Sequence, residues 1–464
     1  MPTSIQASIF KKYDIRGQAL GDNAVLTKDA AYQIGRAFST YLQPFEQKDQ
    51  IVVGRDNRLS SYDLQMALIE GIRAAGCNAV DLGLVATPLV YWHAVRRGNV
   101  GGVMVTGSHL PPEQNGFKLC VGGRTLYGDE IQAIRAIIEA REFFYGSGAF
   151  LDDKAAYSAY VHDLQTRVKS QRPLKVVVDA GNGMGGLFAP RLLELWGHEL
   201  LHCLYCEPDG NFPNHQPDPQ DAANMRDLGE KVRELGADVG FAFDGDCDRV
   251  GVVDEQGQMI AADRVVALLA RDLLGRHPGA AVVADVLSSQ ILFDAVYQAG
   301  GEAIMAPSGH SLVKEAMRDK KALLGGEMSG HIFLGEDYFG FDDGFLAAGR
   351  VLQLLSRSDK ALSALNAQLP TLYTTPEYRP HCPDEDKQRV IAGVAHWLEG
   401  KGQINTVDGV RVNFERGWGL LRASNTEPVL SLRFEGVTEA DALGYRALFE
   451  EALQAYPQVE ALRK

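Results

Sequence analysis

Short apolar runs alternate along most of the chain with segments whose apolar residues recur every three or four positions. The runs predict β-strands, and the recurring pattern predicts amphipathic helices. In three places the order is the same: a strand, a helix, a glycine that ends the helix, and a second strand. The strand pairs are 51–53 with 79–82, 175–178 with 199–204, and 281–283 with 302–305. This alternation predicts related α/β units with largely parallel strands, whose carboxyl ends collect ligands.

The length of the chain indicates several domains. A chain of 464 residues is too long for one hydrophobic core, and its size alone suggests three or four domains. Turn-forming segments near residues 146–153 and 256–258 predict two boundaries. Around 369–376 helical periodicity gives way to turn formers, and the remainder has the pattern of a small α+β domain. We therefore predict domains over 1–150, 151–256, 257–370 and 371–464.

Composition and charge narrow the class of protein. The sequence is 45% hydrophobic and 23% charged, as in folded soluble proteins, and no apolar run is long enough to span a membrane. The N-terminus lacks the pattern of a signal peptide, so we expect a cytoplasmic location. A formal charge of −14 argues against nucleic acid or an anionic membrane as a partner. An anionic ligand would have to be bound by local arginines.

Two short motifs have weak specificity. Cys203 and Cys206 have the spacing of a redox or half-zinc motif, but they lie in an apolar run, and we expect reduced core residues. The segment Gly181–Gly186 matches the spacing of a dinucleotide-binding fingerprint, although a tight turn between strand and helix also explains its glycines. Nothing downstream supplies hydride chemistry, so a dehydrogenase is the least favoured class.

The first candidate for chemistry is Ser108. An apolar run ends at Thr106-Gly107, and Ser108 follows with His109 beside it and Lys118 ten residues further on. A hydroxyl presented at a strand end by a glycine is well placed to carry a transferable group. The residues at 106 and 110 are not the glycines of an acyl-transfer nucleophile elbow, which argues against that chemistry.

The sharpest motif is the acidic loop after the apolar strand 239–243. Asp244, Asp246 and Asp248 stand at alternate positions, so their carboxylates can point the same way. Like charges this close repel one another, and a hard divalent cation, most plausibly Mg²⁺, is the common remedy. A calcium EF-hand is disfavoured because Arg249 stands where that loop needs glycine. A solvated acidic turn is the remaining alternative.

Two later loops have the chemistry of ligand binding. Glu327, Ser329 and His331 offer a carboxylate, a hydroxyl and an imidazole for the hydroxyls of a sugar, although a plain glycine turn explains the loop equally well. The segment from Arg422 through Ser424, Asn425 and Thr426 combines a guanidinium, hydroxyls and an amide. Such a set can cradle a phosphate, or it can form an ordinary polar turn.

Other polar positions border the same predicted cleft. The turn with Tyr13 and Arg16 either lines that cleft or forms structural ion pairs, and for Arg55 and Arg58 we favour the structural role. His310 follows the strand 302–305 and is expected on the ligand-binding side, although loop histidines are more often simple hydrogen-bonding residues.

Taken together, these motifs resemble the α-D-phosphohexomutase superfamily, and most closely its bacterial phosphomannomutase/phosphoglucomutase branch, over essentially the whole chain. The motifs that carry the resemblance are Tyr13–Gly17, Thr106–His109, Asp244–Arg249, Gly326–His331 and Arg422–Thr426. The resemblance implies a heart-shaped molecule of four domains around one cleft. Three related α/β domains with mixed sheets would be followed by an α+β domain of the TBP-like kind, which acts as a lid.

The resemblance also implies the chemistry. Ser108 would be a phosphoserine, with Mg²⁺ held by Asp244, Asp246, Asp248 and the group on Ser108. Glucose 1,6-bisphosphate or mannose 1,6-bisphosphate would be the activator, and the enzyme would exchange hexose 1-phosphate and 6-phosphate through the bisphosphate. The expected substrate-binding residues are Tyr13, Arg249, His310, Glu327, Ser329, Arg422, Ser424, Asn425 and Thr426. The acid and base would be found among His109, Lys118, Arg16 and His331. We expect a monomer.

The sequence departs from the family's pattern at two positions. Leu110 stands where most relatives have asparagine, and Leu287 replaces a basic residue that is common in this branch. Two alternatives therefore stay beside the phosphomannomutase/phosphoglucomutase prediction: a phosphoglucosamine mutase, and a catalytically impaired protein that binds sugar phosphates. Met328 in the sugar loop favours the mannose and glucose branch.

Overall fold

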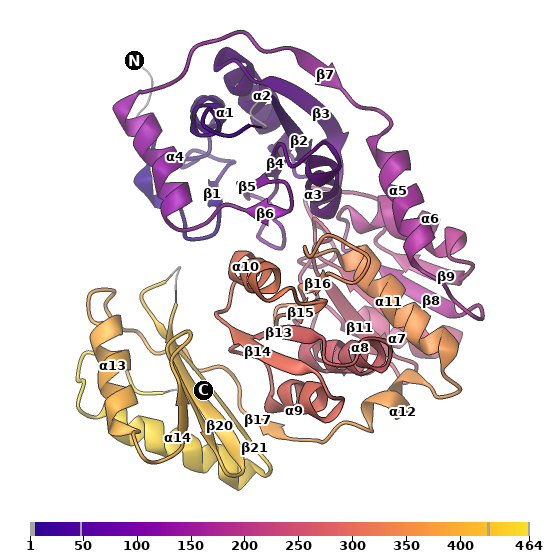
Figure 1. Cartoon of the computed structure of the whole chain (residues 1–464), viewed down its shortest axis with the longest axis vertical. Helices are drawn as coiled ribbons and strands as arrows, with labels where there is room; N and C mark the ends of the chain where they lie inside the picture. The colour runs from indigo at the N-terminus through magenta and orange to yellow at the C-terminus, as the bar shows by residue number, and fades with distance from the viewer. Residues whose placement is uncertain (1–4, 47–48, 425–426, 463–464) are drawn as a thin grey trace.

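A computed structural model describes residues 5–46, 49–424 and 427–462. The chain folds into four successive units, each built on its own β-sheet, and Figure 1 shows the units following one another along an arc. Within the described residues no helix is long and apolar enough to cross a membrane.

The first unit has a mixed sheet with helices on it. Its elements are η1 (Ala7–Ile9), β1 (Ile15–Gln18), α1 (Lys28–Tyr41), β2 (Gln50–Arg55), α2 (Ser61–Ala74), β3 (Asn78–Leu84), α3 (Thr87–Arg96), β4 (Gly101–Val105), β5 (Gln114–Val121), β6 (Arg124–Thr125), α4 (Asp129–Ala140) and β7 (Phe150–Asp152). The strand order is β1-β5-β4-β2-β3-β7, with β6 paired to β5.

The second and third units repeat this plan. The second contains α5 (Ala156–Arg167), β8 (Lys175–Asp179), α6 (Gly185–Leu195), β9 (Glu199–Leu204), α7 (Arg226–Leu235), β10 (Val239–Phe243), β11 (Val250–Asp254) and β12 (Met259–Ile260). The third contains α8 (Ala262–Arg276), β13 (Ala281–Asp285), α9 (Gln290–Gln298), β14 (Glu302–Ala306), α10 (His310–Lys320), β15 (Leu324–Gly326), β16 (Ile332–Leu334), α11 (Gly344–Arg357) and α12 (Leu362–Asn366).

One topology recurs in the first three sheets. Their common parts have the orders β5-β4-β2-β3, β11-β10-β8-β9 and β16-β15-β13-β14. In each sheet three neighbouring strands are parallel and the fourth returns antiparallel. This confirms three related α/β units with mixed sheets. The expectation of largely parallel strands omitted the returning strand, because a short loop, not a crossover helix, connects it.

These short loops matter for function because each of the first three units has one at the same position, before its antiparallel strand. Ser108 lies between β4 and β5, the acidic loop lies between β10 and β11, and Glu327 lies between β15 and β16. Each loop therefore leaves the carboxyl end of a parallel strand, where ligands collect in α/β sheets.

The fourth unit is α+β. It contains β17 (Tyr373–Thr374), α13 (Lys387–Trp397), β18 (Gln403–Asn405), β19 (Val410–Phe414), β20 (Gly417–Ala423), β21 (Leu430–Gly436) and α14 (Glu439–Leu453). Its sheet is antiparallel in the order β17-β21-β20-β19-β18. Arg422 lies near the end of β20, where it pairs with Ser431 of β21, and Ser424 follows the last residue of β20.

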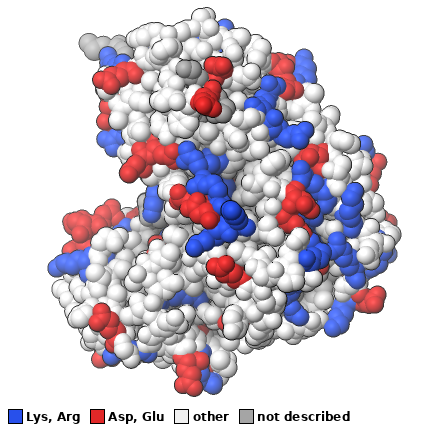
Figure 2. All heavy atoms as spheres, viewed as in Figure 1, with Lys and Arg blue, Asp and Glu red and all other residues white. Residues whose placement is uncertain are grey.

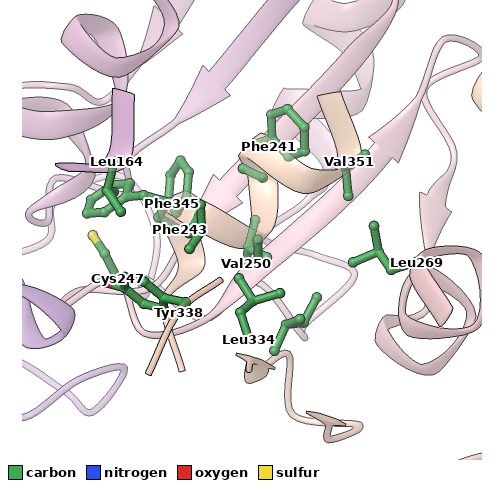
Figure 3. Close-up of a cluster of buried hydrophobic side chains, with 14 of the residues drawn as sticks. Leu164, Phe241, Phe243, Cys247, Val250, Leu269, Leu334, Tyr338, Phe345 and Val351 are labelled. Atoms are coloured by element: carbon green, nitrogen blue, oxygen red, sulfur yellow. The ribbon is translucent and has the colours of Figure 1, made fainter. Parts of the chain in front are cut away.

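A continuous hydrophobic core ties the first three units together. It extends from Val52 and Trp92 in the first unit through the second and third, and Figure 3 shows its central part around Phe243 and Phe345. The rings of these two phenylalanines lie 5.0 Å apart. Because protein interiors are closely packed, this shared core holds the three loops at fixed relative positions.

One local expectation, the state of two cysteines, needs correction. Cys203 and Cys206 were expected to be reduced, but they are joined as a disulfide, with Cα atoms 5.8 Å apart, which is within the range for that bond. They are half-buried at the end of β9.

Candidate active site

The Ser108 loop is held in place by hydrogen bonds from Arg58. Its guanidinium is fully buried and donates to the carbonyl oxygens of Ser108 at 2.7 Å and Leu110 at 2.6 Å. It also donates to the carbonyl oxygens of Pro111 and Gln114. Gly107 is required beneath this loop, because a Cβ there would lie 2.6 Å from the guanidinium carbon. The structural role predicted for Arg58 is confirmed.

The buried carboxylate of Asp56 completes this support. Asp56 pairs with Arg58 at 3.2 Å and accepts a hydrogen bond from the Thr106 hydroxyl at 2.7 Å. The same hydroxyl accepts from the Ser108 backbone N–H at 2.8 Å. Ser108 therefore sits in a left-handed conformation with φ of 51°, which a non-glycine residue adopts only when its surroundings hold it there.

The Ser108 hydroxyl points at the acidic loop. It donates to Asp244 Oδ2 at 2.8 Å and lies 3.1 Å from His109 Nδ1. Burial, followed by the charges of Arg249 and Arg16, holds the pKa of His109 well below its usual range. The imidazole is therefore neutral near pH 7 and has the capacity to accept a proton.

The three aspartates after β10 form one buried group. Asp244, Asp246 and Asp248 are each fully buried, and their ligand atoms all lie within 4.8 Å of one another. Burial and the two neighbouring carboxylates raise the pKa of Asp244 well above its usual range. Lys118, from β5, donates to Asp246 Oδ2 at 2.7 Å and to Asp248. Thr87 donates to Asp246 at 2.5 Å.

This donor set fits a hard divalent cation. Among the described residues, Asp246 Oδ1 and Asp248 Oδ1 are buried without a hydrogen-bond partner, and such oxygens are costly unless something else satisfies them. Carboxylate oxygens are the ligands that Mg²⁺ prefers. The Ser108 oxygen lies at the edge of this group, as the predicted ligand set requires.

The predicted base candidates surround the acidic loop. Arg16, on β1, pairs with Asp14 and has a raised pKa, because Asp14 and the charges of Asp246 and Asp248 outweigh its burial. Arg249 donates from Nε to His331 Nε2 at 3.0 Å, and its backbone N–H donates to Asp244 Oδ1 at 3.1 Å. His331 and Arg249 are thus brought to the acidic loop from two units, in agreement with the isolated bridge between their backbones.

The sugar loop is joined to the start of α10. Glu327 is buried and accepts from the Gly309 backbone N–H at 2.6 Å, and burial raises the pKa of Glu327 to about 7. His310, the first residue of α10, lies against His331 with ring centroids 5.4 Å apart. Burial and the charge of Lys314 lower the pKa of His310 to about 4, so this ring is neutral. Ser329 is half-buried in the same loop.

The predicted phosphate cradle borders a separate cavity of about 240 Å³. The cavity is lined from the first, third and fourth units by Tyr13, Ser308, Gly309, Glu377, Arg379, Arg422, Ser424 and Ser431. Arg422 pairs with Asp408 at 2.9 Å, and Tyr13 donates to the Ser308 carbonyl oxygen at 2.9 Å. Asn425 and Thr426 lie outside the described residues.

The cavity adjoins the sugar loop through one residue. Gly309 lines the cavity, and its backbone N–H donates to Glu327 at 2.6 Å. Figure 2 shows the molecule hollowed between its upper and lower parts, with lysine and arginine side chains gathered beside the hollow. An anion could therefore be attracted there despite the negative net charge.

Sequence reasoning missed several supporting residues. Asp56 and Thr87 each follow a parallel strand of the first sheet, and that position was a usable signal. Asp408, Lys314 and Asp342 gave no local signal, because their partners are distant in sequence. The glycines at 181–186 have a packing role: a Cβ at Gly183 would lie 2.8 Å from the backbone of Gly245 in the acidic loop.

Comparison with known proteins gives one consistent result. Four family models match in order: phosphoglucomutase/phosphomannomutase alpha/beta/alpha domains I, II and III at residues 7–144, 156–257 and 261–373, and the C-terminal domain at 378–452. A phosphomannomutase/phosphoglucomutase of Pseudomonas aeruginosa is 43% identical over 97% of this chain and 96% of its own length. A phosphoglucomutase of Neisseria gonorrhoeae is 43% identical over 98% and 99%.

A solved structure agrees with these sequence matches. The crystal structure of a phosphoglucomutase/phosphomannomutase family protein from Burkholderia thailandensis superposes with a TM-score of 0.92 at 41% identity. The match covers 98% of this chain and 99% of that chain.

Proposed function

The chain belongs to the phosphoglucomutase/phosphomannomutase family, and we propose that it interconverts the 1-phosphate and 6-phosphate of glucose and mannose. The observation that carries the proposal is the contact of the Ser108 hydroxyl with Asp244 in a buried group of three aspartates. A separate cavity is lined by Arg422 and Ser424, and its lining residue Gly309 contacts Glu327 of the sugar loop. A phosphoryl carrier and a remote phosphate cradle are what a mutase needs.

In this proposal Ser108 carries a phosphoryl group. Its Oγ–P bond breaks as a bond forms between that phosphorus and the free hydroxyl of a hexose phosphate, which gives a hexose 1,6-bisphosphate. The bisphosphate then returns its other phosphoryl group to Ser108. Lys118 and Arg16 supply fixed positive charge beside the transferring group, where such charge stabilises the transition state. Mg²⁺, held by Asp244, Asp246 and Asp248, would neutralise further charge there.

The same site must accept the sugar in two orientations. The cradle of Arg422 and Ser424 would hold the phosphate that does not react, and Tyr13 lines the same cavity. As the family resemblance implies, Glu327 and Ser329 would bind the 3- and 4-hydroxyls of the sugar, which roughly exchange places when the sugar is reversed. Because these contacts avoid C2, the loop would tolerate both glucose and mannose, which differ only there.

Protons must leave and reach the sugar oxygens during transfer. His109 and His331 are the side chains that we assign to this, because each imidazole ring lies beside the acidic loop and is held there by a neighbouring side chain. A glucose 1,6-bisphosphate activator, a monomeric state and a cytoplasmic location stay predictions.

A coupled assay tests the function directly. Glucose 1-phosphate, mannose 1-phosphate and glucosamine 1-phosphate are compared, each with catalytic glucose 1,6-bisphosphate and Mg²⁺. We expect the first two to be converted, and Ser108→Ala to lose at least ~10³-fold in kcat. Ser170→Ala is the control and should keep normal turnover. The Ser170 hydroxyl is hydrogen-bonded to His198 Nε2 at 2.8 Å and does not belong to the site. Preference for glucosamine 1-phosphate, or full turnover by Ser108→Ala, would refute the proposal.

A further inference from the structure

A row of buried charged side chains lies behind His331. Lys314 comes from α10, and Asp342 comes from the segment between β16 and α11. Their exposed fractions are 5% for Lys314, 0% for Asp342 and 4% for His331. The backbone of Asp342 is fixed by an isolated bridge to Phe333, and the backbone of His331 by a bridge to Arg249. These positions are therefore set by the sheet and not by side-chain flexibility.

The contacts along this row have a defined direction. Lys314 Nζ donates to Asp342 Oδ1 at 2.9 Å. His331 Nδ1 lies 2.9 Å from Asp342 Oδ2 as an ion-pair contact, and neither of these two buried atoms has another hydrogen-bond partner among the described residues. His310 Nδ1 lies 3.4 Å from the same Asp342 Oδ2, and Asp248 Oδ1 lies 3.7 Å from His331 Nδ1. On the other side of the ring, Arg249 Nε donates to His331 Nε2 at 3.0 Å. An arginine N–H can only donate, so Nε2 must present its lone pair, and the ring proton of a neutral His331 must be on Nδ1.

We propose that Asp342 is a positioning residue that fixes His331 as the Nδ1–H tautomer, so that Nε2 is kept as the acceptor on the side of Arg249 and the acidic loop. The proposal rests on the proposed function, in which His331 exchanges a proton with the sugar. Lys314 supports it by holding Asp342 in place from the opposite oxygen. Although burial alone would raise the pKa of Asp342, Lys314 and the two histidines lower it well below its usual range.

The adjacent residue provides a matched comparison. Asp343 is also fully buried, but it accepts from the Leu346 backbone N–H at 3.0 Å at the start of α11. Its other contacts are the hydroxyls of Tyr160 at 2.7 Å and Tyr338 at 2.8 Å. Asp343 thus stabilises the fold without touching His331. Loss of a buried carboxylate can therefore be compared at two neighbouring positions, of which Asp342 contacts His331 and Asp343 does not.

Replacement of Asp342 by asparagine has a specific consequence. Lys314 has only donors, so the asparagine oxygen must turn toward Lys314 and its NH₂ group toward His331 Nδ1. The ring proton would then move to Nε2, where it opposes the Arg249 N–H. Removing the ammonium as well, in Lys314→Met with Asp342→Asn, lets the asparagine oxygen turn back to His331. The double variant should therefore recover part of what the single variant loses.

The test combines spectroscopy and kinetics on the full-length protein. In protein with ¹⁵N-labelled histidine rings, the His331 signals are identified by their loss in His331→Asn. We expect the Nδ1–H tautomer in the wild type and Asp343→Asn, the Nε2–H tautomer in Asp342→Asn, and partial return in the double variant. With glucose 1-phosphate, kcat of Asp342→Asn should fall roughly 10²- to 10⁴-fold. KM should stay within about threefold, because His310, 3.4 Å away, is the substrate-binding candidate that Asp342 contacts among the described residues.

Several results would overturn the proposal. These are an unchanged His331 tautomer in folded Asp342→Asn, a kcat within threefold of the wild type, or an equal loss of kcat in Asp343→Asn. If Asp342→Asn does not fold, Asp342→Glu is measured in its place, with the Nδ1–H tautomer expected to persist and its absence counting against the proposal. A wild type without mutase activity would refute the proposed function alone, because the tautomer measurement does not depend on turnover.

Discussion

Replacement of Arg58 by methionine should unfold the Ser108 loop locally while leaving the rest of the molecule intact. The buried guanidinium donates to Asp56 and to four carbonyl oxygens of the segment from Ser108 to Gln114. Methionine has a similar length but no donor. It leaves Asp56 as an uncompensated buried charge, and removal of one partner of a buried ion pair typically costs about 3–5 kcal/mol.

The magnitude can be measured at the loop itself. Hydrogen exchange reports the free energy of local opening, and about 3–5 kcal/mol corresponds to a loss of protection of roughly 10²- to 10⁴-fold in β4 and in the segment that follows it. Because the φ of 51° at Ser108 depends on this support, kcat should fall with it. Arg191→Met is the control, because Arg191 is half exposed and forms a surface ion pair with Glu194, so its loss should change protection by less than about 0.5 kcal/mol.

The reasoning would be refuted if Arg58→Met kept wild-type protection in β4 and normal turnover. That result would mean that the loop is held by the sheet alone, and that the hydrogen bonds of Arg58 follow from its position instead of causing it.

Three further predictions concern the other loops. Arg422→Met should raise KM for hexose 1-phosphates by at least about tenfold with a smaller effect on kcat, because it removes a charged contact to the phosphate that does not react. Steady-state kinetics measure both constants, and an unchanged KM would contradict this prediction. Burial raises the pKa of Glu327 to about 7, above its value in the unfolded chain. The free energy of unfolding should therefore fall by up to about 3 kcal/mol as pH rises from 4.5 to 7. Urea titrations measure this fall, and it should be absent in Glu327→Gln. Arg411 is fully buried and donates to the carbonyl oxygens of Val286 at 2.7 Å and Ser288 at 2.8 Å. Arg411→Met should therefore lower the free energy of local opening by about 3 kcal/mol and the hydrogen-exchange protection of 286–290 roughly 100-fold. Wild-type protection in this variant would contradict the role of Arg411.

The sequence predicted the parts of the fold that have local signals. The three strand–helix–strand units were visible because their apolar periodicity and helix-ending glycines lie within about thirty residues of one another. The returning strands β5, β11 and β16 were harder to assign, because an apolar run does not state the direction of its pairing. The predicted fold class, α/β units with mixed sheets, was confirmed. In each of the first three sheets one strand is antiparallel because a short loop connects it to its neighbour.

The candidate site shows the same limit. Asp244, Asp246 and Asp248 were identified from their spacing alone, and the structure brings their carboxylates into one buried group. A structural role was predicted for Arg58, but the sequence did not indicate that its side chain, or that of Arg411, is fully buried. Their partners are backbone carbonyl oxygens, which every residue type has, so the sequence does not indicate where such a partner lies. Contacts of this kind, and the pairing of Lys314 with Asp342, could only be found in three dimensions.

The most direct test of the central claim is to follow a phosphoryl group on and off Ser108. Dephosphorylated full-length protein is incubated with glucose 1,6-bisphosphate, its intact mass is measured, and the modified residue is located by fragmentation. We predict one added phosphate on Ser108, its loss to added glucose 1-phosphate or mannose 1-phosphate, and no phosphate on the Ser108→Ala variant. Interconversion of hexose phosphates by a chain that never carries phosphate on Ser108 would contradict the account.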